Sequence, residues 1–200
     1  MRFEDFKLLY MFSCVGLGLI ILSPTLAVVI KLPGGERFSE LWILGPSHMA
    51  EDYPFNVSGD KLYKVYLGIS NHMGGLKYYR IYVKFRNQTD PLPDMVNGMP
   101  SDLEPLLEYR VFLRHNENWE MEIRFSFDYD IEGNICSVSK LVIDGYALDV
   151  DKVTEWDEEK GGFHFQLFFE LWLYNASVPS FRFYDRFVWI WLNMTSARAR

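Results

Sequence analysis

Apolar and polar side chains alternate along most of the chain beyond its first 37 residues. The stretch from Trp119 to Asp128 places Trp, Met, Ile and two Phe at every second position, with charged or polar residues between them. Successive side chains of a strand point to opposite faces of a sheet, so a strand with one buried face shows this period of two. The pattern therefore predicts a strand with one dry and one wet face.

The same period recurs often enough to predict about eight strands. The other segments are 38–44, 63–69, 79–85, 109–113, 137–143, 163–173 and 187–192. The segment 187–192 is apolar on both faces, so we expect it to run through the middle of a sheet. Turn-forming residues such as Gly74-Gly75 and Gly161-Gly162 separate the segments. Residues 38–195 are therefore expected to form an all-β domain, an immunoglobulin-like antiparallel β-sandwich in the broad sense.

One stretch, residues 87–108, lacks the alternation of apolar and polar residues. Residues 87–108 contain four prolines among acidic residues and show no strand pattern. We expect a long Pro-rich surface loop inserted between strands, and long loops often carry function.

An uncharged apolar run of 23 residues, 8–30, precedes the domain. As a helix it would be about 35 Å long, enough to cross a membrane. It predicts one transmembrane helix between a cytoplasmic segment, 1–7, and a linker, 31–37; residues 196–200 form a C-terminal tail. The alternative is a cleaved signal peptide, because Thr25-Leu26-Ala27 offers small residues near a cut site, although the run exceeds the usual apolar core.

Four Asn-X-Ser/Thr sequons follow the apolar run, at Asn56, Asn87, Asn175 and Asn193. The numbers of Asn, Ser and Thr in the chain would give about 0.8 sequons by chance. Basic residues flank the run on both sides, so charge alone leaves its orientation open. N-glycosylation takes place on the outer side of the membrane, and we therefore expect a single-pass protein with its N-terminus in the cytoplasm and its glycosylated C-terminal domain extracellular.

Composition excludes some classes of function. The net charge is −7 and there is no basic stripe, which disfavours nucleic-acid binding because phosphate binding needs clustered cations. The aromatic content of 17% favours strands and an all-β domain. The two cysteines, Cys14 and Cys136, cannot pair across a membrane boundary, so no internal disulfide is expected. No hydrolase, phosphate-loop or zinc-protease motif is present. The sequence therefore predicts neither an enzyme nor a cofactor.

A partial calcium-loop pattern appears at Asp128, Asp130 and Glu132. Such loops wrap the cation with carboxylate oxygens and need a bidentate Glu at the twelfth position, which here is Ser139. A plain hairpin turn between two strands is the competing interpretation.

The pairs His48-Met49 and His72-Met73 suggest a copper site, because imidazole and thioether are ligands that suit copper. Both pairs lie where strands give way to loops. The competing interpretation is that the Met residues fill gaps and the His residues hydrogen-bond near turns.

Several aromatic residues fall on strand positions opposite the expected core. They are Phe112, Phe168, Trp172 and Tyr174. Their apolar surface exceeds what a lone sandwich should expose. Either the 87–108 loop or a partner protein is expected to cover them.

Five segments resemble the archaeal membrane-protein family of the domain of unknown function 1616. They are 38–46, 50–54, 67–72, 166–172 and 191–195, and the resemblance extends over nearly all of residues 38–195. It implies an archaeal origin and a cell-surface β domain. Many family members carry further membrane helices, so a function held in those helices would here be missing or supplied by a partner. The resemblance implies no catalytic residues.

These observations favour a non-enzymatic cell-surface protein whose sandwich binds a membrane or envelope protein. The expected partners are membrane lipid around the anchor, that protein and N-linked glycans, with no nucleic acid. The alternative is an extracellular metal-binding domain, for copper or calcium, or an enzymatic accessory domain.

Overall fold

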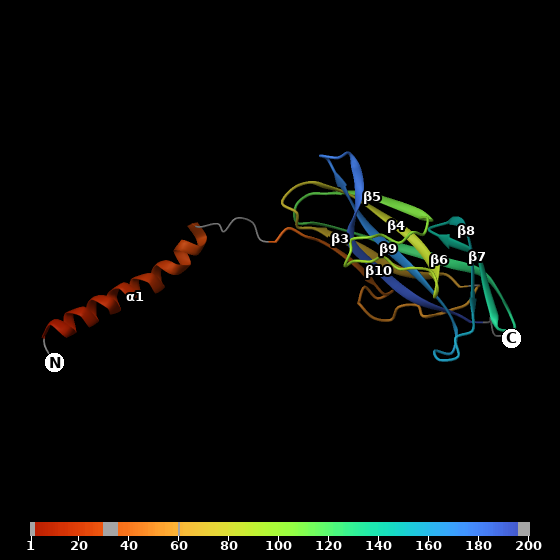
Figure 1. Cartoon of the computed structure of the whole chain (residues 1–200), viewed down its shortest axis with the longest axis horizontal. Coiled ribbons are helices and arrows are strands. Elements are labelled where there is room, and N and C mark those ends of the chain that lie inside the picture. The colour runs from red at the N-terminus through yellow and green to blue at the C-terminus, as the bar shows by residue number, and fades with distance from the viewer. Residues whose placement is uncertain (1–2, 30–35, 60, 196–200) are drawn as a thin grey trace. The chain divides into compact units, whose positions relative to one another are not determined.

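The computed structural model describes residues 3–29, 36–59 and 61–195 (Figure 1). Residues 30–35, which include most of the expected linker, and the expected tail 196–200 lie outside the described residues, as do residues 1–2 and 60. The chain divides into two compact units, Met1–Arg37 and Phe38–Arg200.

The first unit contains one α-helix, α1 (Phe3–Val29). It begins five residues before the expected apolar span. Large apolar side chains between Phe6 and Ile21 are exposed. The expected span continues into positions 22–30, whose side chains are outside the described part. Among the residues described, no helix meets the combined length and hydropathy needed to cross a membrane.

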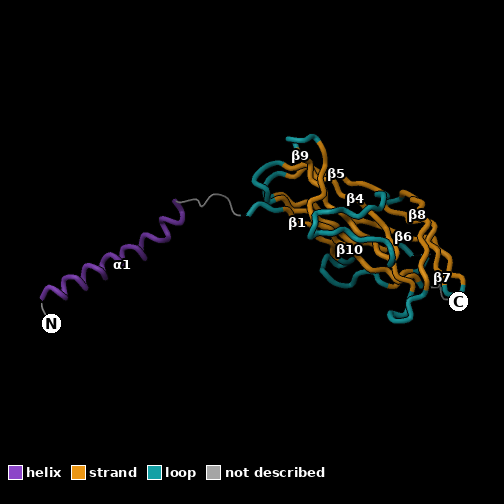
Figure 2. Tube along the Cα trace, viewed as in Figure 1, coloured by secondary structure: helices purple, strands orange, loops and turns teal. Residues whose placement is uncertain are grey.

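The second unit consists of two five-stranded sheets, whose strands are the orange segments in Figure 2. The first sheet has the order β1-β3-β6-β7-β8, formed by β1 (Ser39–Leu44), β3 (Tyr63–Asn71), β6 (Glu117–Glu132), β7 (Ile135–Ile143) and β8 (Tyr146–Glu155). The second has the order β2-β10-β9-β4-β5, formed by β2 (Asn56–Val57), β10 (Ser180–Met194), β9 (Phe163–Asn175), β4 (Lys77–Asn87) and β5 (Leu107–Leu113).

All pairings between these strands are antiparallel except the short β2–β10 pair. The expected all-β sandwich is therefore present. The chain crosses from one sheet to the other after β1, β2, β3, β5 and β8. Strands that are consecutive in the sequence therefore often lie in opposite sheets.

The core lies between the sheets and is rich in aromatic side chains. Phe85 of β4 contacts Phe127 of the opposite sheet and Phe165 of β9, with ring centroids 5.3 and 5.2 Å apart. The alternating residues of β6 supply Ile123, Phe125 and Phe127, all fully buried. The period of two in the sequence thus marks the core face of this strand correctly, because one face meets the other sheet and one meets solvent.

Two strands were not expected from the sequence. Strand β2 has only two residues, too few for any period. Strand β8 is an edge strand with mixed exposure along its length, and a bulge opposite Val138–Lys140 shifts its register. Edge strands have one solvent-facing edge and weak hydrophobic patterning, which explains why β8 escaped detection.

The expectation for residues 187–192 is wrong. Most of β10 pairs only with β9, since β2 reaches only Asn193 and Met194. Trp189 and Trp191 are 42% and 36% exposed. The apolar residues on the outer face of β10 therefore do not mark a strand in the middle of a sheet.

Strand β9 takes that place instead. Every residue from Phe163 to Leu171 is buried, on both faces. The inner face meets the core, and the outer face is crossed by the connection between β4 and β5, residues 88–106. The backbone N–H of Ser101 in this connection donates to Oε1 of Glu170 over 2.9 Å. The Pro-rich segment is thus a cover for the second sheet.

Candidate functional site

Two of the four sequons contact each other at one end of the sandwich. Asn56 of β2 and Asn193 of β10 are in register, and Nδ2 of Asn193 donates to Oδ1 of Asn56 over 3.1 Å. Oδ1 of Asn193 accepts a hydrogen bond of 3.0 Å from the backbone N–H of Phe163. A Cβ at Gly162 would overlap the Asn193 amide. Asn193 is therefore packed into the fold, whereas Asn56 is exposed.

The other two sequons also differ in whether the side-chain amide nitrogen of the asparagine is hydrogen-bonded. Nδ2 of Asn87 donates to the carbonyl of Val153 over 2.9 Å. Oδ1 of Asn175 accepts from the backbone N–H of Ser177 over 2.9 Å, while its Nδ2 has no hydrogen-bond partner among the described residues. A glycan is attached through Nδ2 of asparagine. The structure therefore leaves this atom without a partner at Asn56 and Asn175, within its described part, and engages it at Asn87 and Asn193.

The His48-Met49 pair is accounted for by local contacts. The imidazole of His48 stacks on the ring of Tyr66 at 3.5 Å between centroids, and its Nδ1 lies 3.1 Å from Oε1 of Glu120. Met49 is 55% exposed.

The His72-Met73 pair is engaged by different residues. Nε2 of His72 lies 2.7 Å from Oγ of Ser70, and Nδ1 lies 3.1 Å from Oδ1 of Asn116. The hydroxyl of Tyr184 donates to the sulfur of Met73 over 3.3 Å. The two imidazoles thus contact different residues, His48 through stacking and a carboxylate and His72 through hydrogen bonds, which supports the interpretation of these residues as turn-stabilising side chains.

The acidic run does not form a calcium-type loop. Asp128, Asp130 and Glu132 lie within the extended strand β6, which turns at Gly133 (φ 60°) into β7. Same-face neighbours in a strand are about 6.6–6.8 Å apart along it, so the chain does not wrap around a central cation. Within residues 3–29, 36–59 and 61–195, no group of three or more His, Cys, Asp or Glu side chains is placed to hold a metal ion.

The four outward-facing aromatic residues have different environments. Phe168 is fully buried, with the ring of Phe187 against it at 6.4 Å, so it cannot meet a partner. Trp172 is half-buried and donates through Nε1 to Oε2 of Glu170 over 3.2 Å. Tyr174 is also half-buried, and only Phe112 is highly exposed, at 60%. The sequence could not distinguish them, because their burial depends on contacts made only in the folded domain, such as that of Phe187 with Phe168.

A buried ion pair, not anticipated from the sequence, attaches the connection 88–106 to the outer face of the second sheet. Nζ of Lys84 lies 2.9 Å from Oε2 of Glu170, and the same ammonium donates to the carbonyl of Ser101 over 2.7 Å. The side chains of Lys84 and Glu170 are 3% and 0% exposed. Buried charges are tolerated when they are paired and fully hydrogen-bonded, as here. The pair fixes the covering connection to both β4 and β9.

The middle of the connection 88–106 forms a small hairpin whose tip is apolar. Asp94 and Met99 form an isolated antiparallel bridge. The Asp94 carboxylate accepts from the side chain of Asn97 and from backbone N–H groups of the turn, and these bonds lower the pKa of Asp94. Met95, Val96 and Met99 are 51%, 94% and 58% exposed. We call these three side chains the hairpin tip.

Four aromatic rings cluster on the outer face beside the free edge of β5. The ring of Phe112 stacks on Tyr78 with 4.0 Å between centroids and 6° between planes. Tyr174 and Phe181 pack against Tyr78 at 5.9 and 4.9 Å. The guanidinium of Arg80 lies 3.9 Å from the centroid of Phe181, a cation–π contact. We call Tyr78, Phe112, Tyr174 and Phe181 the edge cluster.

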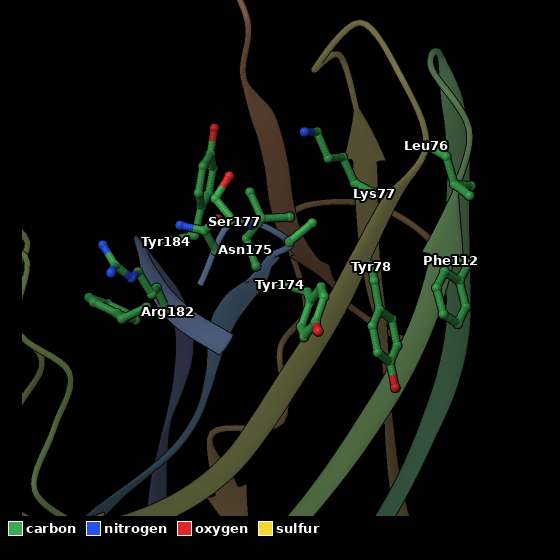
Figure 3. A pocket seen from close by; sticks show the side chains of 12 residues that line it. Leu76, Lys77, Tyr78, Phe112, Tyr174, Asn175, Ser177, Arg182 and Tyr184 are labelled. Carbon is green, nitrogen blue, oxygen red and sulfur yellow. Dashed lines mark hydrogen bonds between the residues drawn. The ribbon is translucent and has the colours of Figure 1, made fainter. Parts of the chain in front are cut away.

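A pocket of about 470 Å³ lies at the edge cluster. In Figure 3, Tyr78 and Tyr174 stand between Phe112 and Leu76 on one side and Arg182 and Tyr184 on the other, with Lys77, Asn175 and Ser177 at the upper rim. Its size is within the range of small-molecule sites, about 300–1,000 Å³. The lining combines aromatic faces with cationic and amide donors.

Two buried titratable groups lie elsewhere in the sandwich. His164 of β9 is 3% exposed, its Nε2 has no partner within the described chain, and burial lowers its pKa. Its ring lies near Phe55 and Trp191, at 5.8 and 6.4 Å between centroids. Burial raises the pKa of Cys136 to about 12, with a smaller contribution from the charge of Asp130. A thiol with so high a pKa is unreactive, because the thiolate is the nucleophile.

The fold defines this chain as an all-β sandwich protein. It belongs to the family described as Domain of unknown function (DUF1616), whose family model matches residues 32–137, more than half of the 200 residues. The match ends before segments 166–172 and 191–195, which also resembled the family. No curated protein sequence matches the chain.

Among solved structures, the chain is similar to crystal structures of β-glucosidase from Listeria innocua. The complex with isofagomine has 9% identity and a TM-score of 0.34, and the complex with glucose has 9% and 0.32; each alignment covers 80% of this chain and 16% of the enzyme. The complex with gluconolactone has 10% identity and a TM-score of 0.29, covering 80% of this chain and 17% of the enzyme. The chain spans about one sixth of these enzymes, and such TM-scores assign neither fold nor activity.

Proposed function

We propose that this is a non-enzymatic, single-pass cell-surface protein of archaeal origin. Residues 8–30 anchor it in the cell membrane with residues 1–7 in the cytoplasm, and an immunoglobulin-like sandwich stands outside as a glycosylated domain. The uncharged run of 23 residues and the four downstream sequons support this arrangement. The sandwich binds another protein of the membrane or envelope.

The observation that carries the binding proposal is the exposure of the hairpin tip. Val96 is 94% exposed and is flanked by two exposed methionines, although hydrophobic burial is the main driving force of folding. Three apolar side chains at the end of one ordered hairpin form a surface that burial in a partner would stabilise. Methionine side chains are flexible and polarisable, which suits a binding surface.

The hairpin is held in place rather than loose. Its base is fixed by Ser101, which contacts both Lys84 and Glu170. Gly98, with φ of +66°, lies against the carboxylate of Asp185 at the bulge in β10; a Cβ there would be 3.0 Å from Oδ1. A preorganised apolar tip loses little conformational entropy on binding. The order of the hairpin therefore favours a role in binding a protein surface over the alternative that it is a solvated loop without function.

The partner is expected to be a protein of the same membrane or envelope. The domain has a net negative charge and no basic stripe, so nucleic acid is not a partner. Tethered sandwich domains commonly bind proteins, an argument that rests on fold analogy alone.

Copurification from native membranes in mild detergent tests this function. The full chain should retain a membrane or envelope protein at near-stoichiometric amounts. Val96→Asp should abolish retention, because it places a charge in the centre of the interface. Val178→Asp, the same substitution at a half-exposed valine (50%) on the β9–β10 turn, is the control and should retain the partner.

Two results would contradict the proposal. One is a wild-type chain that purifies as a monomer with no partner at native abundance. The other is equal retention by wild type and Val96→Asp, which would show that binding does not use the hairpin tip.

A further inference from the structure

The residues that line the pocket at the edge cluster include a sequon. Asn175, Ala176 and Ser177 belong to its wall, at the turn that joins β9 to β10 (Figure 3). Oδ1 of Asn175 is held by the N–H of Ser177, which fixes the amide plane. Its Nδ2 has no partner among the described residues. The atom to which a glycan would be attached therefore sits at the rim of a pocket.

The pocket wall has the chemistry that binds sugars. Pyranose rings present C–H groups on their faces, which pack on the faces of aromatic rings, and hydroxyl groups on their edges. Phe112 is 60% exposed above Tyr78, so the edge cluster offers an apolar face to a ligand. Lys77 and Arg182 also line the pocket, but they pair with Leu113 and Leu173, which pack in or against the core, so they belong to the opposite face of the sheet. The aromatic face is therefore the part of the wall that a sugar meets.

Other sequons lack this combination. Asn56 is exposed, but it does not line the pocket at the edge cluster or the one beside Trp156. Asn87 lines a second pocket beside Trp156, but its Nδ2 is bonded to the Val153 carbonyl. Of the four asparagines, only Asn175 combines an unpartnered Nδ2, within the described part of the chain, with an adjacent aromatic wall.

We propose that the glycan attached to Asn175 folds back into this pocket and covers the edge cluster. Attachment joins Nδ2 to the anomeric carbon of a sugar carried on a lipid phosphate; the bond from that carbon to the phosphate oxygen breaks, and Nδ2 loses a proton, which the released phosphate takes up overall. The first sugars then stack on the exposed face of Phe112, whose other face is covered by Tyr78. The occupant of the exposed aromatic surface is thus part of the same molecule. The inference rests on the proposed placement of the domain outside the membrane.

The test compares removal of two sequons in the full chain, produced in a host that performs N-glycosylation. Ser177→Ala removes the Asn175 site without changing Asn175, and Ser58→Ala removes the Asn56 site as the matched control. Peptide mass spectrometry measures occupancy, and thermal unfolding in detergent measures stability. Ser177→Ala should lower the midpoint by about 2–4 °C, the shift that one stabilising contact of ordinary strength gives in a domain of this size. Ser58→Ala should shift it by less than half of that amount.

A second pair of variants tests whether the glycan uses the edge cluster. In a Phe112→Ala background, the effect of Ser177→Ala should fall to nearly zero, since the stacking surface is gone. Phe112 is mostly exposed, so its removal leaves the core intact. Independently of that variant, hydrogen exchange of the amides in β5 should be slower in the glycosylated wild type than in Ser177→Ala.

The outcomes separate this inference from the proposed function. An occupied Asn175 with unchanged stability, no coupling to Phe112 and no effect on exchange in β5 overturns the inference alone. An unmodified Asn175 with a modified Asn56 also overturns it, while the domain remains outside the membrane. If none of the four sequons is modified, both proposals fall.

Discussion

The ammonium of Lys84 and the carboxylate of Glu170 meet at 2.9 Å on the outer face of the second sheet, beneath residues 88–106. Both side chains belong to positions that would face solvent in an ordinary sandwich. They are buried because the connection between β4 and β5 lies over them and is bonded to both through Ser101. The pair therefore links the covering segment to the sheet.

Removing one partner should be strongly destabilising. Glu170→Ala leaves Lys84 buried and uncompensated, which typically costs about 3–5 kcal/mol. The midpoint of urea unfolding should fall accordingly. Limited proteolysis should also cut within residues 88–106 earlier than in wild type, because the segment loses its attachment to β9. A variant as stable and protease-resistant as wild type would show that the pair does not hold the segment.

An exposed ion pair serves as the comparison. Arg110 and Glu108 on β5 form a contact with 51% and 34% of their side chains exposed. Arg110→Ala should change the unfolding free energy by no more than about 1 kcal/mol, because water and salt screen exposed pairs. The contrast between the two variants isolates the effect of burial.

Gly68 should tolerate no side chain. The indole of Trp42 lies directly over it, so a Cβ would overlap the ring. Gly68→Ala should therefore cost about 1–3 kcal/mol, as overpacking does, and lower the thermal midpoint. Gly75→Ala is the control, because no atom lies within 4 Å of the added Cβ. Adding Trp42→Ala to Gly68→Ala should recover part of the loss, and the absence of any recovery would point to backbone strain instead.

The stability of the domain should depend on pH through His164. Burial lowers its pKa below the usual value of about 6.5, so the unfolded chain binds this proton more readily than the folded one. Its contribution to stability is complete above pH of about 6.5 and is lost as the pH falls through the lowered pKa. His164→Phe keeps a ring beside Phe55 but cannot be protonated. Urea midpoints between pH 7 and pH 5 should therefore fall less in this variant, and parallel pH profiles would refute the assignment.

Cys136 should not react with alkylating reagents in the folded protein. With its pKa raised to about 12, roughly 10⁻⁴ of the thiol is ionised at pH 8. In a Cys14→Ser variant, iodoacetamide should leave native protein unlabelled at pH 8 and should label it fully in urea. Native labelling at a rate close to that of the unfolded chain would show that this part of β7 opens readily.

The strand content of the domain could be predicted well from the sequence. Where one face of a strand meets the core, as at Ile123, Phe125 and Phe127, local alternation records the burial directly. The prediction failed where burial depends on a distant segment. Strand β9 appeared one-sided, yet its second face is buried by residues from several distant segments, among them Phe55, Ser101 and Phe187. The segment 187–192 appeared two-sided, yet its tryptophans are exposed.

The candidate sites show the same division. Sequons, His-Met pairs and the acidic run are visible as short motifs, but motifs do not record which side-chain atoms are already engaged. Asn56 and Asn193 are separated by 137 residues, and only the parallel pairing of β2 with β10 brings their amides into contact. The Lys84–Glu170 pair has no local signal, because its residues are 86 positions apart.

By itself the sequence determined the all-β class, the apolar run near the N-terminus and the four sequons, because each depends only on residues that are close together in the chain. The tertiary structure decided which aromatic side chains remain exposed, which asparagine amides are already engaged and which charged residues are buried. Those properties depend on segments that meet only after the two sheets have packed. The edge cluster beside Asn175 is the clearest case, since four strands, β4, β5, β9 and β10, bring its rings together.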